Sequence, residues 1–161
     1  MLFSSSDDDY QFGTINIGNN TLSDSIGIEF WIKTDIGNDP ILYRKDGSGS
    51  NSAYWSVEVE NGLLSFNGIT STGDAYNLSS GSNIIGDWMH CGVFVQSDSI
   101  RIFINGVKES SLLRPSGELS SKQRIWVATK GSNISPDFND QFEGHIYDLR
   151  FWDKIPSYNL F

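Results

Sequence analysis

The chain has 161 residues, 38% of them hydrophobic, and a formal net charge of -9. This length fits one ordinary domain spanning residues 1–161, and the composition is that of a folded globular protein. The acidic balance disfavours nucleic acid as a partner. No apolar run reaches the roughly 18–20 residues that cross a bilayer, so we expect no membrane insertion. The one cysteine, Cys91, cannot form an internal disulfide, and we interpret it as a small buried hydrophobe.

Short runs of alternating apolar and polar residues recur along the chain between clusters of Gly, Ser, Asn and Asp. No apolar pattern with helical spacing lasts three turns, so we expect strands. The strands are predicted at 10–17, 26–33, 41–45, 54–60, 63–67, 90–96, 99–105, 124–128 and 145–152. The stretches 70–83 and 109–123 are polar enough to be long loops. This succession predicts an all-β protein, a two-sheet antiparallel β-sandwich of the jelly-roll kind.

Two Asn-Gly pairs predict tight hairpins between consecutive strands. Asn61-Gly62 and Asn105-Gly106 each supply the two positive-φ positions that a type I′ turn requires. Just before the second pair, isoleucines alternate with other residues over 100–104, which is the period of a strand with one buried side. The sequence therefore fixes two hairpins and the inward face of one strand.

Several motifs follow one another in a characteristic order. They are the strand Ile26-Gly-Ile-Glu-Phe-Trp-Ile-Lys33, the segment Asp87-Trp-Met-His90, the hairpin at 99–107 and the closing segment 142–152, preceded by an opening strand with Tyr10. In this order and spacing they resemble the laminin-G-like domains of the concanavalin A-like jelly-roll superfamily. The resemblance covers about residues 3–157 and implies a sandwich that recognises a ligand.

The tryptophans and histidines of these motifs also have a plain structural interpretation. Trp31, Trp88 and Trp152 lie in apolar strand contexts, so we expect them to pack between the two sheets. His90 has only His145 as a second histidine, and neither a nucleophile nor a metal-ligand set accompanies it. We therefore expect a hydrogen-bonded structural histidine.

Paired carboxylates raise the question of catalysis, because laminarinase-type glycosidases use the same kind of sandwich. Glu58 and Glu60 are two residues apart on a predicted strand, so both face one side about 7 Å apart, a spacing compatible with sugar hydrolysis. Those enzymes carry three acids on one strand, whereas this strand has two, alternating with Val57 and Val59. We interpret both glutamates as solvated and assign no catalytic residue.

The acidic run at 7–9 is either a solvated chain start or a source of hard oxygen ligands for Ca²⁺. In domains that this chain resembles, a calcium ion often lies between the opening segment and the closing strand. The resemblance thus implies one structural Ca²⁺ held by Asp8, Asp9 and Asp148, with Glu143 as a weaker candidate. Many relatives have two successive acids where this chain has Tyr147 and Asp148, so one ligand is missing.

The favoured function is a non-catalytic recognition module that binds carbohydrate or a glycosylated surface. Its partner would be a glycan or glycoprotein, and its place an extracellular, cell-surface or virion protein with protein neighbours in a larger assembly. A structural or oligomerising domain of a fibre, capsid or adhesin, and a glycoside hydrolase, are the alternatives. Binding requires exposed aromatics beside amides and carboxylates. The candidate ligand-binding residues are Tyr43, Asn51, Tyr54, Asp74, Tyr76 and Trp126.

Overall fold

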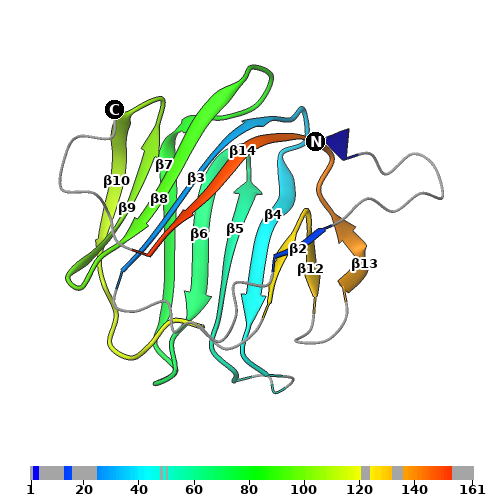
Figure 1. Cartoon of the computed structure of the whole chain (residues 1–161). Coiled ribbons are helices and arrows are strands. Elements are labelled where there is room, and N and C mark those ends of the chain that lie inside the picture. Colours follow the sequence, from blue (N-terminus) through cyan, green and yellow to red (C-terminus); the bar gives the residue numbers. More distant parts are fainter. Residues whose placement is uncertain are drawn as a thin grey trace.

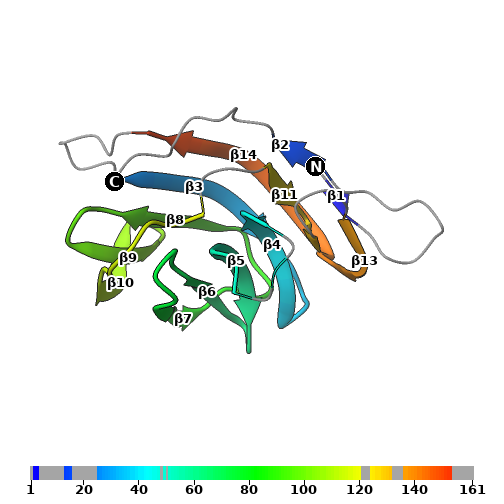
Figure 2. The same cartoon turned by 90° about the horizontal axis from the view of Figure 1, so that it is seen from below.

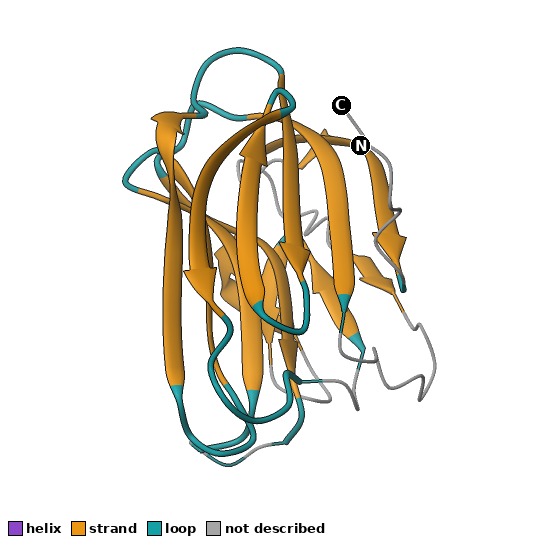
Figure 3. Cartoon of the chain, turned by 90° about the vertical axis from the view of Figure 1, so that its left-hand side faces the viewer, coloured by secondary structure: helices purple, strands orange, loops and turns teal. Residues whose placement is uncertain are grey.

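The computed structural model describes residues 2–3, 13–15, 25–47, 49, 51–120, 124–131 and 136–153. Within these ranges the chain forms strands, turns and loops but no helix (Figure 3). Consequently, no helix that could cross a membrane occurs in the described part. Two six-stranded sheets, antiparallel throughout, lie face to face as two layers (Figures 1 and 2). The predicted all-β sandwich is confirmed.

The two layers are called sheet A and sheet B, and their strands follow in spatial order. Sheet A consists of β1 (Leu2–Phe3), β14 (Gly144–Trp152), β3 (Ile26–Lys33), β8 (Met89–Val95), β9 (Ser99–Ile104) and β10 (Val107–Leu113). Sheet B consists of β2 (Gly13–Ile15), β11 (Ile125–Val127), β4 (Asn38–Lys45), β5 (Tyr54–Glu60), β6 (Leu63–Ile69) and β7 (Ala75–Asn83). A separate hairpin, β12 (Thr129–Gly131) and β13 (Pro136–Gln141), packs beside β4.

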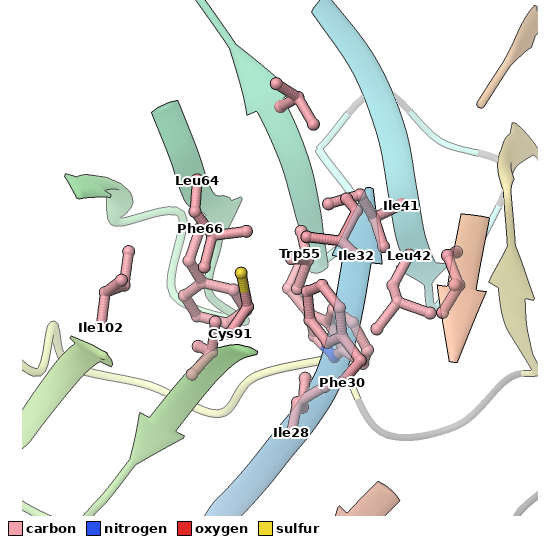
Figure 4. Packing of buried hydrophobic residues seen from close by; sticks show 14 of the residues in the cluster. Ile28, Phe30, Ile32, Ile41, Leu42, Trp55, Leu64, Phe66, Cys91 and Ile102 are labelled. Atoms are coloured by element: carbon pink, nitrogen blue, oxygen red, sulfur yellow. The ribbon is translucent and has the colours of Figure 1, made fainter. Parts of the chain in front are cut away.

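The core lies between the sheets and is made by strand alternation. On β3 the side chains of Ile28, Phe30 and Ile32 are fully buried, and they meet Trp55 and Phe66 of sheet B (Figure 4). Burying one such side chain contributes roughly 1.5–3 kcal/mol. Cys91 belongs to the same cluster, and burial raises the pKa of its thiol. The interpretation of Cys91 as a buried hydrophobe is confirmed.

Both predicted Asn-Gly turns are confirmed by backbone geometry. Asn61 and Gly62 have φ angles of 52° and 79°, and Asn105 and Gly106 have 49° and 80°. The first turn joins β5 to β6, and the second joins β9 to β10. The left-handed conformation at both central positions matches the twist of the flanking strands, which is why Asn-Gly is favoured there.

Two stretches predicted as loops contain strands, so these predictions are wrong. The polar run 75–83 is β7, where Tyr76, Leu78 and Ser80 point inward and are buried. The run 107–113 is β10, the outermost strand of sheet A. Both are edge strands, whose outward positions face water and can be polar, so composition alone did not distinguish them from loops.

The expectation that the three motif tryptophans pack between the sheets is wrong, because Trp31 and Trp88 are exposed and Trp152 pairs in register with Gly27 on the outer face of sheet A. Trp31 is 37% exposed and Trp88 is 45% exposed. Phe30 and Ile32 point inward, so the alternation of β3 turns Trp31 to the outer face of sheet A. Trp152 is half-buried, and its Nε1 donates a hydrogen bond of 2.6 Å to Glu29 Oε2.

Trp55→Phe should destabilise the fold because Trp55 is anchored by a polar contact inside the core. Its Nε1 donates to the carbonyl oxygen of Ser120 at 3.1 Å, and both residues are buried. Phenylalanine leaves that carbonyl without its donor, which costs about 1–3 kcal/mol. We expect urea unfolding to register this loss. Trp31→Phe on the exposed outer face is the matched control and should stay within about 0.5 kcal/mol of wild type.

Candidate functional site

The outer face of sheet B carries a row of polar and aromatic side chains. Val57 and Val59 of β5 point into the core, as predicted, so Ser56, Glu58 and Glu60 face the other side. The partner residues of Glu58 and Glu60 on β6 are Ser65 and Leu63. Glu58 and Glu60 are partly buried rather than fully solvated, because neighbouring strands enclose them in a shallow pocket.

This pocket has a volume of about 350 Å³, which lies within the roughly 300–1,000 Å³ range of small-ligand sites. It opens between the start of β4, the end of β5 and the β12–β13 hairpin, which Figure 1 shows beside β4. Most of its lining groups are charged or carry amides. The lining residues are Asn38, Asp39, Pro40, Glu58, Val59, Glu60, Asn67, Lys130 and Asp140.

Lys130 is the cation among the residues that line this pocket. Its Nζ lies 3.1 Å from Glu58 Oε2 and 3.1 Å from Asp140 Oδ2, so it bridges β5 and β13. Burial by itself would lower the pKa of Lys130, but the two ion pairs outweigh burial and raise it. Asp39 also lines the pocket, and burial raises the pKa of its carboxyl. Lys130 is therefore charged at neutral pH and holds two acceptors in fixed positions.

Two tyrosines form an aromatic surface beside the pocket. The rings of Tyr43 and Tyr54 stack with centroids 5.9 Å apart and an interplanar angle of 30°. Burial is the main cause that raises the pKa of Tyr43, followed by Tyr54, while Lys130 acts in the opposite direction. Tyr43 lies in the same strand row as Asn67, which lines the pocket, so the stacked rings and the charged pocket are neighbours. An apolar ring surface thus borders fixed polar groups.

Two buried polar atoms lie in the strand row that contains Tyr43. Ser56 is the register partner of Tyr43 on one side and of Asn67 on the other. Ser56 Oγ and Asn67 Oδ1 are both buried, and neither has a hydrogen-bond partner within the described ranges. Asn67 also lines the pocket. Since buried polar groups in proteins are normally paired, this row holds unused hydrogen-bonding capacity.

Two of the candidate binding residues predicted from sequence lie on this face. Tyr43 and Tyr54 are brought together, and Asn51 lies exposed in the turn just before β5. Asp74 has a structural role instead. Its carboxylate accepts hydrogen bonds from Thr72 and Ser116, which connect the β6–β7 turn to the loop that follows β10.

The exposure expected of Tyr76 and Trp126 is wrong. Tyr76 is 6% exposed because β7 points it inward, where its ring lies 5.4 Å from Phe66. Trp126 faces outward opposite Tyr43 but is 3% exposed, with the guanidinium of Arg124 lying 5.6 Å from the centre of its ring. Neither ring can stack on a ligand in this conformation.

Sequence reasoning missed the residues that complete the pocket, namely Asn67, Lys130 and Asp140. Asn67 lies on β6, far in the chain from Lys130 and Asp140 on β12 and β13, and no motif connects the three residues. One signal was available in the sequence. Glu58 lies in the middle of a predicted strand, where burying an unpaired carboxylate would cost desolvation free energy. A nearby cation was therefore to be expected as the ion-pair partner of Glu58, but the sequence does not indicate which of its 11 lysines and arginines this is.

The predicted calcium ligands fall partly outside the described residues. Asp8 and Asp9 lie there. Both carboxylate oxygens of Asp148 are held by Arg150, with Nε at 3.0 Å from Oδ1, and the described ranges contain no group of three His, Cys, Asp or Glu side chains that could hold a metal. Asp148 and Glu143 alone do not fit a calcium site, which needs 6–8 oxygen ligands.

The fold and this face define an antiparallel β-sandwich with an aromatic and polar surface on the outer side of sheet B. A family model described as the concanavalin A-like lectin/glucanases superfamily matches residues 5–158. The chain belongs to this superfamily, which confirms the resemblance seen in the motifs. No curated protein matches the sequence significantly.

Several solved structures share the fold at low sequence identity. The carbohydrate-binding module CBM40 of the Ruminococcus gnavus IT-sialidase is 14% identical over 85% of this chain and 80% of its own, with a TM-score of 0.69. Mouse laminin α1 domains LG4-5 are 12% identical over 87% of this chain and 38% of that one, with a TM-score of 0.67. The receptor-binding domain of botulinum neurotoxin D is 19% identical over 97% and 40%, with a TM-score of 0.68. The chain thus spans well under half of the laminin and toxin chains.

Proposed function

We propose that this chain is a non-catalytic carbohydrate-binding module whose ligand binds on the outer face of sheet B. The observation that carries the proposal is the stacked Tyr43–Tyr54 pair beside the pocket bridged by Lys130. The apolar C–H face of a sugar ring packs on aromatic faces, and its hydroxyls need amides and carboxylates at the edge. Sheet B supplies both elements within one surface.

The comparisons support this proposal at the level of the fold. CBM40 of the Ruminococcus gnavus sialidase has also been solved bound to α2,3-sialyllactose, with a TM-score of 0.68 to this chain. We further propose that the module belongs to a larger extracellular, cell-surface or virion protein that meets a glycan or glycoprotein. A glycan array tests the class of ligand directly. Array-wide absence of binding, both with calcium and with EDTA, would contradict the proposal.

A laminarinase-type hydrolase would require a third acid in line with Glu58 and Glu60 on β5, and the strand provides none. Ser56 occupies the same-face position two residues before Glu58, and Glu58 is held by Lys130. We therefore expect no release of reducing sugar from a panel of polysaccharides. The measurement compares the chain with Glu58→Gln under identical conditions. Turnover that disappears in Glu58→Gln would overturn the non-catalytic assignment.

One observation favours an assembly role as a second candidate. The edge strand β10 exposes Val107 to 61% and Leu113 to 82%, and an exposed sheet edge can pair with another chain. Light scattering after size exclusion decides between the roles. A stable oligomer that dissociates in Leu113→Asp supports assembly, whereas a monomer supports recognition.

The calcium expectation stays a prediction. A calcium site near Asp148 would need the aspartates at 7–9 as further ligands. The hydrogen bonds from Arg150 to the carboxylate of Asp148 would have to break. Thermal unfolding with calcium and with EDTA, repeated on Asp148→Asn, tests this arrangement. An equal midpoint in all conditions would contradict it.

A further inference from the structure

The outer face of sheet A carries a second aromatic surface, on the opposite side of the sandwich from the pocket. Trp31 of β3 pairs in register with Tyr147 of β14 on one side and with His90 of β8 on the other. The next position on β3 is Lys33, which pairs with His145. These strand neighbours form a compact group because side chains two residues apart share one face.

Ring contacts link two pairs of side chains within the group. The Trp31 and His90 rings have centroids 5.1 Å apart, and Trp88, just before β8, lies 6.0 Å from His145. Trp31, Trp88 and Tyr147 are the large side chains that remain exposed here, the last to 65%. We call the six residues Trp31, Lys33, Trp88, His90, His145 and Tyr147 the sheet A patch.

At the other end of the same face, large aromatic side chains are covered, so the fold does not require aromatic rings on this face to be exposed. There the rings of Phe94 and Trp152 close over Gly27, and a Cβ at that glycine would lie 3.1 Å from both. Glu29, also on this face, is buried and accepts the Trp152 indole N–H. The sheet thus covers its aromatic rings at one end and leaves two indoles and a phenol open to solvent at the other.

The patch also differs from the rest of the chain in charge. Its six side chains include one lysine and two histidines but no carboxylate, in a chain with 20 acidic residues and a net charge of -9. Lys33 forms no ion pair with any described residue. The nearby acid on β14, Asp148, is held by Arg150, and Asp35 and Asp87 belong to turns beyond the strand ends.

We propose that the sheet A patch is a second ligand site, separate from the pocket of sheet B, and that it binds a carboxylate-bearing sugar. The indole and phenol faces accept the C–H face of the sugar ring. Lys33, with the two imidazoles beside it, meets the carboxylate through charge-assisted hydrogen bonds. A neutral sugar would stack but lose the charged contact. The site does not depend on the proposed function of sheet B, because the two faces share no residue.

The test titrates the chain with α2,3-sialyllactose against lactose, and with trigalacturonic acid against its methyl ester. The two pairs distinguish a sialylated from a uronic-acid source. Indole N–H signals in a ¹H–¹⁵N spectrum locate the ligand: Trp31 and Trp88 should shift, whereas Trp126 on sheet B and buried Trp55 should not. We expect at least one acidic sugar to bind about tenfold more tightly than its neutral counterpart.

Variants separate the parts of the site. Trp31→Ala should weaken binding of the acidic sugar about tenfold or more. Lys33→Ser should remove the preference for the acidic sugar over its neutral counterpart. Lys108→Ser, an exposed cation on edge strand β10, removes the same charge and should change nothing. Equal binding of acidic and neutral sugars, no binding of either acid at millimolar concentration, or shifts confined to Trp126 would each overturn the proposal. So would a dimer that Trp31→Ala dissociates.

Discussion

The double variant Tyr43→Ala/Tyr54→Ala should bind the glycan proposed for sheet B about thirtyfold to several hundredfold more weakly than wild type. Each ring contributes stacking surface on one side of the ligand, and aromatic anchors of this kind are worth about 1–2 kcal/mol each. The two rings also stack on one another at 5.9 Å, so removing either one loosens the other. Calorimetric titration with the strongest glycan from the array measures the loss.

Tyr54→Phe provides the sharper comparison, because it keeps the ring and removes only the hydroxyl. We expect it to retain most of the affinity if stacking carries the binding. Leu113→Ala, at an exposed position on the edge strand β10, should leave the affinity unchanged. Unchanged binding in the double variant, with a folded spectrum, would place the glycan elsewhere on the molecule.

The central strands were predictable because one side of each is buried. Strands 26–33 and 54–60 were predicted with the bounds that the structure gives them. Alternation also fixed which residues of β5 face the core. Strands β7 and β10 were missed because edge strands tolerate polar side chains on the face that water reaches. The predicted strand at 124–128 is likewise cut short at Ala128, whose φ of 63° separates β11 from β12.

The site was only partly predictable, because it depends on which residues lie side by side on neighbouring strands of the sheet. Tyr43 and Tyr54 were found as aromatics near loops, but their stacking follows from the β4–β5 register. Tyr76 has the same residue type and a similar sequence context, yet the inward position on β7 buries it. Trp31 was assigned to the core for its hydrophobicity, although its place between Phe30 and Ile32 required the outer face. Where the type of a residue and its alternating position along the strand gave opposite expectations, the alternating position predicted the burial of the side chain correctly.

Gly68→Ala should unfold sheet B or destabilise it by about 3 kcal/mol or more, at the upper end for overpacking a filled interior. Gly68 lies on β6 between Trp55 and Tyr76 in the strand register. A Cβ there would collide with the carbonyl oxygen of Tyr54 and with the hydroxyl of Tyr76. The strand predicted from sequence ends at Asn67, whereas β6 continues to Ile69 because Gly68 leaves room for the side chain of Tyr76.

Gly37→Ala is the matched control, because its nearest neighbours would lie 3.7 Å away and its backbone is in an ordinary conformation. It should change stability by at most about 1 kcal/mol, on the stabilising side. The double variant Gly68→Ala/Tyr76→Phe then separates the two obstacles. Removing the hydroxyl relieves one contact, but the Tyr54 carbonyl is backbone and cannot move without breaking the β5–β6 ladder. We therefore expect partial rescue in urea unfolding, and full rescue would show that the backbone contact is harmless.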